Sequence, residues 1–471
     1  MGRFIDREKG LKILREFWRG TEHFLIVYGR RRIGKSRLIK EFLKEIGSSE
    51  YVYLLAGKKP VRYNLRKFVR RISEKLGFRL PHFNDFVELF EYLAGILRNR
   101  KFLIVIDEFT YLVERDEGVL SDFQEIVDEI LPNTNIKLIL TGSLVGMMET
   151  KVLGYKSPLY GRSQRIIKLP PLGFKAVIEW FSGVSYSDVF KIYAVTNGVP
   201  KYLEFFKGGD VEAEIRKNFF NSSSFLFRDA IELLKEELRD PTNYVIILEA
   251  IANGLTKLSE ISNYTFIEPT KLTPYLRTLR HLGIVQRRIP ILSPKKARRG
   301  IYTISDFYYL FWFRFVSPYF EEIEAEMPEN AINDFEKNFN TYLGLPFECL
   351  TRKLIRYTLI RYGLKPIRIG KWWYRDIDID IVAIDDKNKT ILFGEAKWSK
   401  LGNRDIYRLL TRLGDKSEAF PHKKSYRKVY CIVAREFREK PSNLEDTILI
   451  DLNELCENMY ARIITQNNPY C

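Results

Sequence analysis

Cysteine is scarce in this chain of 471 residues, which contains four of them. They stand at Cys349, Cys431, Cys456 and Cys471, and no two have the CxxC spacing that is typical of a zinc site. Four scattered thiols in a chain of this length indicate a protein from a reducing compartment. The sequence therefore predicts no structural zinc.

Long hydrophobic runs are also missing. No apolar stretch approaches the ~20 residues that a membrane-spanning helix needs. The densest stretch, Phe307 to Phe315, is short and includes Arg314. The N-terminus lacks the apolar core of a signal peptide, and no amphipathic anchor for a membrane surface is evident. We therefore expect a cytoplasmic protein without a membrane partner.

Acidic residues are too few to balance the basic ones. The chain has 60 Asp and Glu against 77 Lys and Arg, which gives a formal net charge of +17. A basic protein of this kind most often meets nucleic acid, so DNA is the expected partner. The alternative explanation of the positive net charge is that it serves solubility and thermal adaptation. At ~100–200 residues per domain, the length predicts several domains.

The first part of the chain alternates short apolar runs with amphipathic segments. Buried strands are predicted at residues 24–28, 51–55, 102–106 and 136–141. Strands that alternate with helices predict a parallel sheet covered by helices on both faces, which we assign to residues 1–172. Helical patterns continue without strands over residues 173–240, and they predict a helical lid.

A complete phosphate-binding loop lies between the first strand and the helix that follows it. Residues 29–36 read Gly-Arg-Arg-Arg-Ile-Gly-Lys-Ser and match the G-x-x-x-x-G-K-[ST] pattern. Gly29 and Gly34 allow backbone N–H groups to wrap a phosphate. Lys35 is expected to reach the β- and γ-phosphates, and Ser36 to ligate Mg²⁺. The following helix directs the positive end of its dipole at the anion, so the loop predicts a site for ATP and Mg²⁺.

Polar residues end two of the later strands. Asp107 follows the strand at 102–106 and is predicted to help hold Mg²⁺, while Glu108 is predicted to polarise the attacking water. Two exposed acids after a strand are the alternative. Ser143, or Thr141, ends the strand at 136–141 and is placed to sense the γ-phosphate or the water. A simple strand-to-helix turn explains that position equally well.

In this region the chain resembles the archaeal ATPase family, a branch near the AAA+ and signalling NTPases. The segments that match lie, in the family's order, at residues 4–8, 28–32, 106–109, 141–143, 158–162 and 198–203. The resemblance implies ATP hydrolysis with a conformational change reported by the lid. It also nominates Arg162 as a charge-stabilising arginine, although a structural salt bridge is the equal alternative. Arg162 would indicate a homo-oligomer only if it acted in trans.

Residues 241–325 have a different pattern. Three helices are predicted near residues 244–252, 258–261 and 270–282, and two short strands follow at 284–288 and 301–304. Three helices followed by a hairpin is the order of a winged helix. Pro274 disfavours a helix interior, so a start at Thr273 is the alternative for the third helix.

Basic residues crowd this winged-helix segment. Arg277 and Arg280 stand on the third predicted helix, which suits a major groove. Four more stand in the loop between the two strands, which suits phosphates or a minor groove: Lys295, Lys296, Arg298 and Arg299. We expect these residues to contact DNA. A basic solvated surface and a protein-contact module are the alternatives.

Residues 326–471 return to an α/β pattern and hold a second group of charged residues. A long helical stretch at 335–361, with a possible break at Gly344 and Pro346, comes first. Strands are then predicted at 376–384, 390–396, 429–434 and 447–450.

Asp380 lies on the first of these strands, and period-two alternation puts Glu395 and Lys397 on one face of the second. Two carboxylates near a lysine can hold Mg²⁺ and an activated water. Glu348, on the preceding helix, can add a further acid. The alternative is an ion pair between Glu395 and Lys397 at the sheet surface.

This constellation resembles the PD-(D/E)XK nuclease superfamily, in the version fused to archaeal ATPases. Trp372-Trp373 before the Asp strand and Lys397-Trp398 at the end of the motif carry the resemblance, together with Asp380 and Glu395. No Pro precedes Asp380, which the superfamily tolerates. The resemblance implies an α-β-β-β-α-β core over residues 335–455 and metal-dependent DNA cleavage by Asp380, Glu395 and Lys397.

The sequence thus predicts a multidomain α/β chain: a P-loop parallel sheet with a helical lid, a winged helix, and a C-terminal restriction-endonuclease-like α/β domain. Two functions fit this plan. The first is an ATP-binding and hydrolysing protein that acts on DNA and carries a Mg²⁺-dependent endonuclease. The second is a regulatory signalling NTPase switch, with a winged helix that binds DNA or protein and a C-terminal domain that does not cleave.

Overall fold

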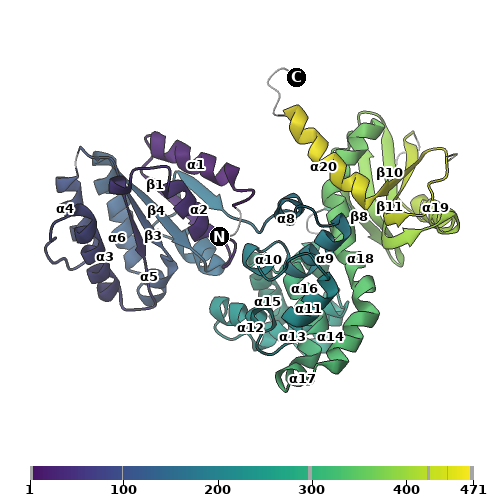
Figure 1. The fold of residues 1–471 in the computed structure, drawn as a ribbon, viewed down its shortest axis with the longest axis horizontal. Coiled ribbons are helices and arrows are strands. Elements are labelled where there is room, and N and C mark those ends of the chain that lie inside the picture. The colour runs from purple at the N-terminus through teal and green to yellow at the C-terminus, as the bar shows by residue number, and fades with distance from the viewer. Residues whose placement is uncertain (1–3, 98, 295–299, 422–424, 443, 467–471) are drawn as a thin grey trace. The chain divides into compact units, whose positions relative to one another are not determined.

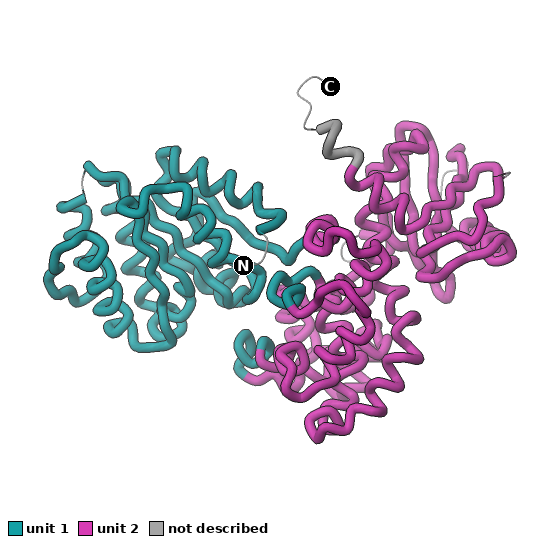
Figure 2. Tube along the Cα trace, viewed as in Figure 1, with its two compact units in different colours: residues 1–172, 198–204, 233–239 teal, residues 173–197, 205–232, 240–471 magenta. Residues whose placement is uncertain are grey.

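A computed structural model describes residues 4–97, 99–294, 300–421, 425–442 and 444–466, the last six by their backbone alone. The chain forms two compact units (Figure 2). Unit 1 comprises residues 1–172, 198–204 and 233–239, and unit 2 comprises residues 173–197, 205–232 and 240–471. Among the described helices, none is long and apolar enough to cross a membrane.

Unit 1 is built on a sheet of five parallel strands (Figure 1). In spatial order these are β2 (Tyr51–Leu55), β3 (Phe102–Asp107), β4 (Ile136–Gly142), β1 (Phe24–Tyr28) and β5 (Arg165–Lys168). The four predicted strands are confirmed. The edge strand β5 was not predicted, because only one of its four residues is buried and the strand begins and ends with a basic residue.

Helices cover both faces of this sheet, because its central strands are apolar on both sides. Leu25 and Val27 of β1 pack with helices α1 (Glu8–Arg19) and α2 (Lys35–Leu43). Phe24 and Ile26 pack in the opposite core with α3 (Val61–Leu76), α4 (Phe86–Ile96) and α6 (Val119–Glu125). The remaining helices of unit 1 are short: α5 (Thr110–Arg115), α7 (Val145–Met147) and α10 (Pro200–Leu203).

The predicted lid is helical, as expected. Its helices are α8 (Phe174–Trp180), α9 (Tyr186–Thr196), α11 (Val211–Phe219) and α12 (Phe225–Glu237). Most of them cluster with unit 2, whereas the last residues of α12 belong to unit 1.

Three helices and a hairpin follow in the predicted order. They are α13 (Thr242–Ala252), α14 (Leu258–Thr265), α15 (Pro269–His281), β6 (Val285–Arg288) and β7 (Ile301–Ile304), and the two strands pair antiparallel. The prediction of the third helix at 270–282 is confirmed, whereas the alternative start at Thr273 is wrong. Pro269 occupies the first turn, where no intrahelical N–H is needed, and Pro274 is accommodated inside the helix while Leu272, Leu276 and Leu279 are buried.

An aromatic helix, α16 (Phe307–Phe315), is buried within unit 2 in all but one of its residues, and the short α17 (Phe320–Glu324) follows it. Trp312 donates its indole N–H to the Phe227 carbonyl at 2.7 Å, and Tyr308 donates its hydroxyl to the Leu226 carbonyl at 2.9 Å. These rings are buried and hydrogen-bonded, so they serve the core and not a stacking platform.

The C-terminal part contains a mixed sheet in the order β12-β11-β10-β9-β8. Its elements are α18 (Glu329–Leu359), β8 (Arg368–Tyr374), β9 (Ile377–Asp385), β10 (Thr390–Leu401), α19 (Asn403–Glu418), β11 (Arg427–Phe437), β12 (Thr447–Asp451) and α20 (Leu452–Gln466). The expected break at Gly344 and Pro346 is wrong. Helix α18 continues because its buried face, which includes Leu343 and Phe347, outweighs the hydrogen bond that Pro346 removes.

Candidate functional site

The glycine-rich loop between β1 and α2 has the backbone that the motif predicts. Gly29 has a φ of +151°, and a Cβ added there would lie 2.4 Å from the Leu169 carbonyl oxygen. Gly34 has a φ of +90° at the N-terminus of α2. Both positions therefore require glycine, one for close approach and one for a left-handed conformation.

Lys35 lies inside this loop. Its ammonium group donates to the carbonyl oxygens of Gly29 at 2.8 Å and Arg30 at 2.9 Å. The side chain is buried, and that burial lowers the pKa of Lys35 to about 8. A buried ammonium held by neutral carbonyls is well placed to bind an anion.

Arg7, which the sequence placed in a family motif without a role, braces the loop. Its guanidinium donates to the carbonyls of Ile33 at 2.9 Å and Pro170 at 3.0 Å. It thereby ties the chain before α1 to the loop and to the segment after β5.

Asp107 ends β3 at the centre of a hydroxyl cluster. Ser36 donates to its Oδ2 at 2.8 Å, and the hydroxyls of Tyr53 and Thr141 donate to the same carboxylate. A hydroxyl and a carboxylate in contact are ligands that Mg²⁺ prefers, so Ser36 and Asp107 fit the predicted metal. Tyr53 was missed, because nothing in its strand marks it as a partner of a residue 54 positions away.

Glu108 follows in a left-handed conformation, with a φ of +58°. Such a backbone costs about 1–3 kcal/mol at a residue other than glycine and is often found at functional sites. The Ser143 hydroxyl donates to Glu108 Oε2 at 2.5 Å. The backbone N–H of Glu108 donates to Asp107 Oδ1 at 3.0 Å. The structure thus brings together the three polar residues that the sequence placed at the ends of β3 and β4.

Acidic residues at the end of α12 complete this region of unit 1, and the sequence analysis missed them. Glu236 forms an ion pair with Arg31 of the loop at 2.6 Å. Glu237 accepts from the backbone N–H groups of Val145 at 3.1 Å and Gly146 at 3.3 Å. The last turn of the predicted lid therefore contacts the phosphate-binding loop directly.

Arg162 forms a salt bridge. Its Nε lies 2.7 Å from Asp128, and its Nη1 donates to the Pro158 carbonyl at 2.6 Å. The geometry agrees with the structural alternative, and a role for Arg162 in charge stabilisation stays a prediction.

The predicted DNA-binding residues are described only in part. Arg277 and Arg280 are exposed on α15, whose Leu272, Leu276 and Leu279 are buried. Lys295, Lys296, Arg298 and Arg299 lie outside the described residues.

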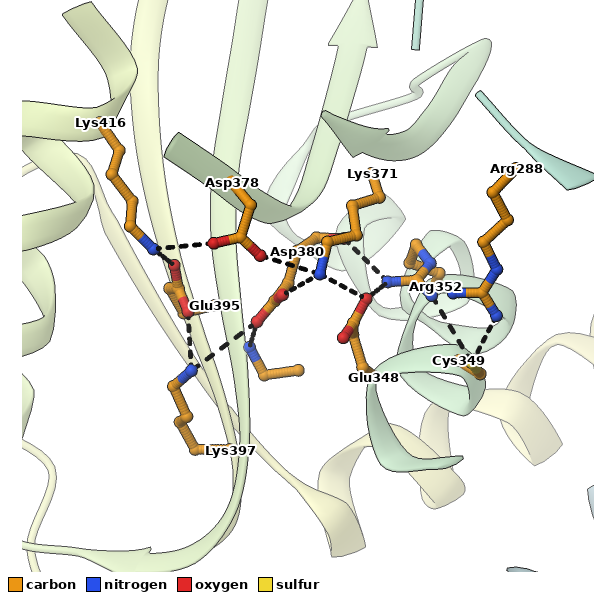
Figure 3. A network of polar contacts seen from close by, with 11 residues as sticks. Arg288, Glu348, Cys349, Arg352, Lys371, Asp378, Asp380, Glu395, Lys397 and Lys416 are labelled. Carbon is orange, nitrogen blue, oxygen red and sulfur yellow. Dashed lines mark hydrogen bonds and ion pairs between the residues drawn. The ribbon is translucent and has the colours of Figure 1, made fainter. Parts of the chain in front are cut away.

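A second polar network lies on the C-terminal sheet (Figure 3). Between Gly370 and Trp372 the register shifts, so that Lys371 of β8 faces two residues of β9, Asp380 and Ile381. Such a β-bulge redirects side chains. Because of it, Ile379 and Val382 face the same core although three positions separate them.

The three residues predicted to form the nuclease site lie together. Lys397 places its ammonium 2.9 Å from Glu395 Oε2 and 3.9 Å from Asp380 Oδ2. Asp380 Oδ2 also accepts from the Ala396 backbone N–H at 3.2 Å. Asp380 and Glu395 are both buried, so their interactions are little screened by solvent.

Two further lysines, which the sequence analysis missed, contact these acids. Lys371 lies 3.1 Å from Asp380 Oδ1, and Lys416 of α19 lies 2.6 Å from Glu395 Oε1. Burial alone would raise the pKa of Asp380. The Lys371 and Lys397 ammonium groups nevertheless hold that pKa below its usual value. Burial and the nearby Asp380 carboxylate raise the pKa of Glu395.

Glu348 of α18 lies in this network, as predicted, but its carboxylate forms ion pairs with two cationic side chains. Arg352 pairs with its carboxylate, and Lys371 lies 3.2 Å away. Arg352 also donates to the Asp380 carbonyl at 3.0 Å. Among the described residues, no group of three or more Asp, Glu, His or Cys is arranged to hold a metal ion.

The carboxylates of Asp380 and Glu395 nevertheless suit Mg²⁺, which typically binds through one or two carboxylates together with water and substrate oxygens. Each of their four oxygens now faces a lysine ammonium. The donor set fits the metal once at least one of these lysines turns away.

Comparison with known proteins identifies two segments. Residues 4–206 match a family described as an ATPase domain predominantly from Archaea, and residues 312–409 match a family described as archaeal and bacterial proteins of unknown function. An uncharacterized protein of Methanocaldococcus jannaschii is 36% identical over 457 residues, which cover 96% of this chain and 99% of that protein.

A solved structure shares the fold. The Walker-type ATPase of Pyrococcus abyssi matches with a TM-score of 0.51 and 22% identity, over 66% of this chain and 96% of that one. The predicted P-loop ATPase fold is thereby confirmed. The chain belongs to a family of archaeal P-loop ATPases in which the ATPase domain is followed by a C-terminal domain of unknown function.

Proposed function

We propose that this ATPase acts on DNA and that its C-terminal sheet cleaves the DNA. The observation that carries the proposal is the contact of one ammonium, that of Lys397, with both Asp380 and Glu395. A buried pair of carboxylates beside a lysine is a suitable arrangement for metal-assisted phosphodiester hydrolysis. The basic net charge of +17 supports DNA as the substrate.

In the ATPase site, each residue has a role that follows from its contacts. The loop N–H groups and Lys35 would bind the phosphates, and Ser36 and Asp107 would hold Mg²⁺, which would neutralise charge on the phosphates. Glu108 accepts a proton from the attacking water. Ser143, which donates to Glu108 at 2.5 Å, keeps that carboxylate oriented.

In the C-terminal site, Asp380 and Glu395 would hold Mg²⁺, which would supply Lewis-acid chemistry for phosphodiester hydrolysis. Lys397 would stabilise negative charge on the scissile phosphate. Arg277 and Arg280 would contact phosphates of the bound DNA, since both are exposed on α15.

One observation favours the alternative, a regulatory switch that does not cleave. All four carboxylate oxygens of Asp380 and Glu395 face lysines, which would neutralise the acids without a metal. A network of this kind can be a structural or DNA-gripping element.

A cleavage assay separates the two functions. The full chain is incubated with branched, single-stranded and duplex DNA in Mg²⁺ or Mn²⁺, beside Asp380→Asn and Asp378→Asn. Asp378 is a matched control, because it contacts the same Lys371 at 2.9 Å but has an exposed side chain. Cleavage that is lost in Asp380→Asn and kept in Asp378→Asn supports the nuclease. No cleavage of any substrate by a wild type that still hydrolyses ATP contradicts it and favours the switch.

A further inference from the structure

A pocket of about 320 Å³ opens in unit 2 between the β6–β7 hairpin, α18 and β8. Four of its lining residues are cationic, namely Arg288, Arg352, Lys353 and Lys371, and its lining includes no Asp or Glu. A concave surface of one charge sign concentrates the electrostatic potential, so this pocket attracts anions.

Two of the four cations have no acid to balance them. Arg288 donates to the Cys349 sulfur at 2.8 Å, and neither Arg288 nor Lys353 forms an ion pair within the part of the chain that the structure describes. Arg352 and Lys371, in contrast, are paired with Glu348, which does not line the pocket. The pocket therefore carries a surplus of two positive charges, which matches the charge of a terminal phosphate.

The remaining wall suits a phosphate attached to a base or sugar. A guanidinium binds phosphate through two parallel N–H groups, and an aromatic ring can stack on a base. Arg288 lines the pocket with a guanidinium whose Nε and Nη2 donate to the Gln286 amide oxygen at 3.0 and 2.8 Å, so a phosphate would have to displace that amide or bind the remaining N–H groups. The half-buried Trp373 supplies the ring. A volume of about 320 Å³ is at the lower end of small-molecule sites, which run from ~300 to ~1,000 Å³. It suits one nucleotide and not a duplex.

We propose that this pocket binds the phosphate of a single nucleotide, either a free mononucleotide or the 5′-phosphorylated end of a DNA strand. The site is separate from the phosphate-binding loop and does not require that Asp380 and Glu395 cleave anything. Since Lys371 and Arg352 reach from the pocket to Glu348 and Asp380, a phosphate bound there would compete with those acids for their cations (Figure 3).

The test measures binding of a thymidine tetranucleotide, with a 5′-phosphate or a 5′-hydroxyl, to the full chain carrying Lys35→Ala. That background removes binding by the phosphate-binding loop. The 5′-phosphate is expected to tighten binding by about tenfold, as charged hydrogen bonds to a phosphate do. Arg288→Ala combined with Lys353→Ala should abolish the gain, and Lys353→Ala alone should reduce it without threatening the fold, because Lys353 is exposed.

A matched control removes two other exposed lysines of unit 2, by Lys217→Ala with Lys337→Ala, and should keep the gain. Thymidine 5′-monophosphate identifies the source: binding as tight as that of the phosphorylated tetranucleotide indicates a free nucleotide, and much weaker binding indicates a strand end. Equal binding of the 5′-phosphate and 5′-hydroxyl forms would overturn the proposal. So would a phosphate gain that survives in the variant lacking Arg288 and Lys353.

Discussion

At the scale of single residues, the proposed ATPase mechanism depends on the orientation of Glu108. Its backbone is left-handed, and Ser143 and Asp107 fix its side chain and its N–H. Such a constrained carboxylate can accept a proton from water without first having to be ordered. Its removal should therefore affect the chemical step and leave nucleotide binding intact.

Glu108→Gln is expected to bind ATP normally and to hydrolyse it at least ~100-fold more slowly, the usual contribution of a general base. Steady-state hydrolysis and nucleotide binding are measured in parallel. Glu114→Gln, which changes an exposed acid of α5, should behave as wild type. A Glu108→Gln variant that hydrolyses ATP at the normal rate would assign the base to another residue.

Lys371 is the residue on which the C-terminal network is centred. Its ammonium contacts Glu348 at 3.2 Å, Asp378 at 2.9 Å and Asp380 at 3.1 Å. Although burial opposes its charge, Asp380 and Glu348 raise the pKa of Lys371 above its ordinary value. The Lys371 ammonium thus supplies the positive charge that balances these three carboxylates.

Lys371→Met should leave those carboxylates uncompensated and lower the unfolding temperature of unit 2. Breaking a buried ion pair costs ~3–5 kcal/mol, which corresponds to roughly 5–10 °C here. Mn²⁺ should restore much of the loss, since the acids can then bind the metal. Thermal unfolding with and without Mn²⁺ gives the answer, with Lys400→Met, from an exposed pair with Glu436, as the control. An unfolding temperature that does not respond to Mn²⁺ would argue against a metal site.

At the scale of elements, apolar runs made most of the fold predictable. Strands β1, β3 and β4 are largely apolar, apart from Lys137 within β4 and polar residues at the ends of β3 and β4, and each was found from its composition. Strand β8 was not, because its partly exposed residues mix basic and aromatic side chains. Helix α18 was predicted with a break, because local rules for proline do not include the burial of Leu343 and Phe347.

The site was predictable where its residues share a motif or a strand face. Lys35, Asp107 and Asp380 follow from motifs, and Glu395 with Lys397 follows from alternation along β10. Lys416 could not be found, because it comes from α19 and meets Glu395 only through the packing of that helix on the sheet. Lys371 depends on a β-bulge that no pattern in the sequence marks.

The exposed arginines of helix α15 are predicted to contribute to DNA binding. Two exposed arginines that contact phosphates should together contribute about two units to the slope of log affinity against log salt. Arg277→Ala with Arg280→Ala should therefore weaken duplex binding and flatten that slope by about 1.8. Titrations over a range of salt concentrations measure both quantities, with Lys217→Ala and Lys337→Ala as a charge-matched control. An unchanged slope would remove α15 from the DNA-binding surface.

At the scale of the whole molecule, one chain carries a nucleotide site in unit 1 and an acidic network in unit 2. The α12 helix, which spans both units, ends in Glu236 and Glu237 beside the phosphate-binding loop. Under the proposed function, we predict that ATP binding or hydrolysis changes the rate of cleavage at the C-terminal sheet.

The rate of DNA cleavage by the full chain, with and without ATP, tests the account most directly. We predict that wild type cleaves in Mg²⁺ or Mn²⁺ and that ATP changes the rate. Lys35→Ala should lose that response while Asp380→Asn loses cleavage altogether. Cleavage that persists in Asp380→Asn, or a rate that is the same with and without ATP, would contradict the claim that the two sites serve one DNA-processing enzyme.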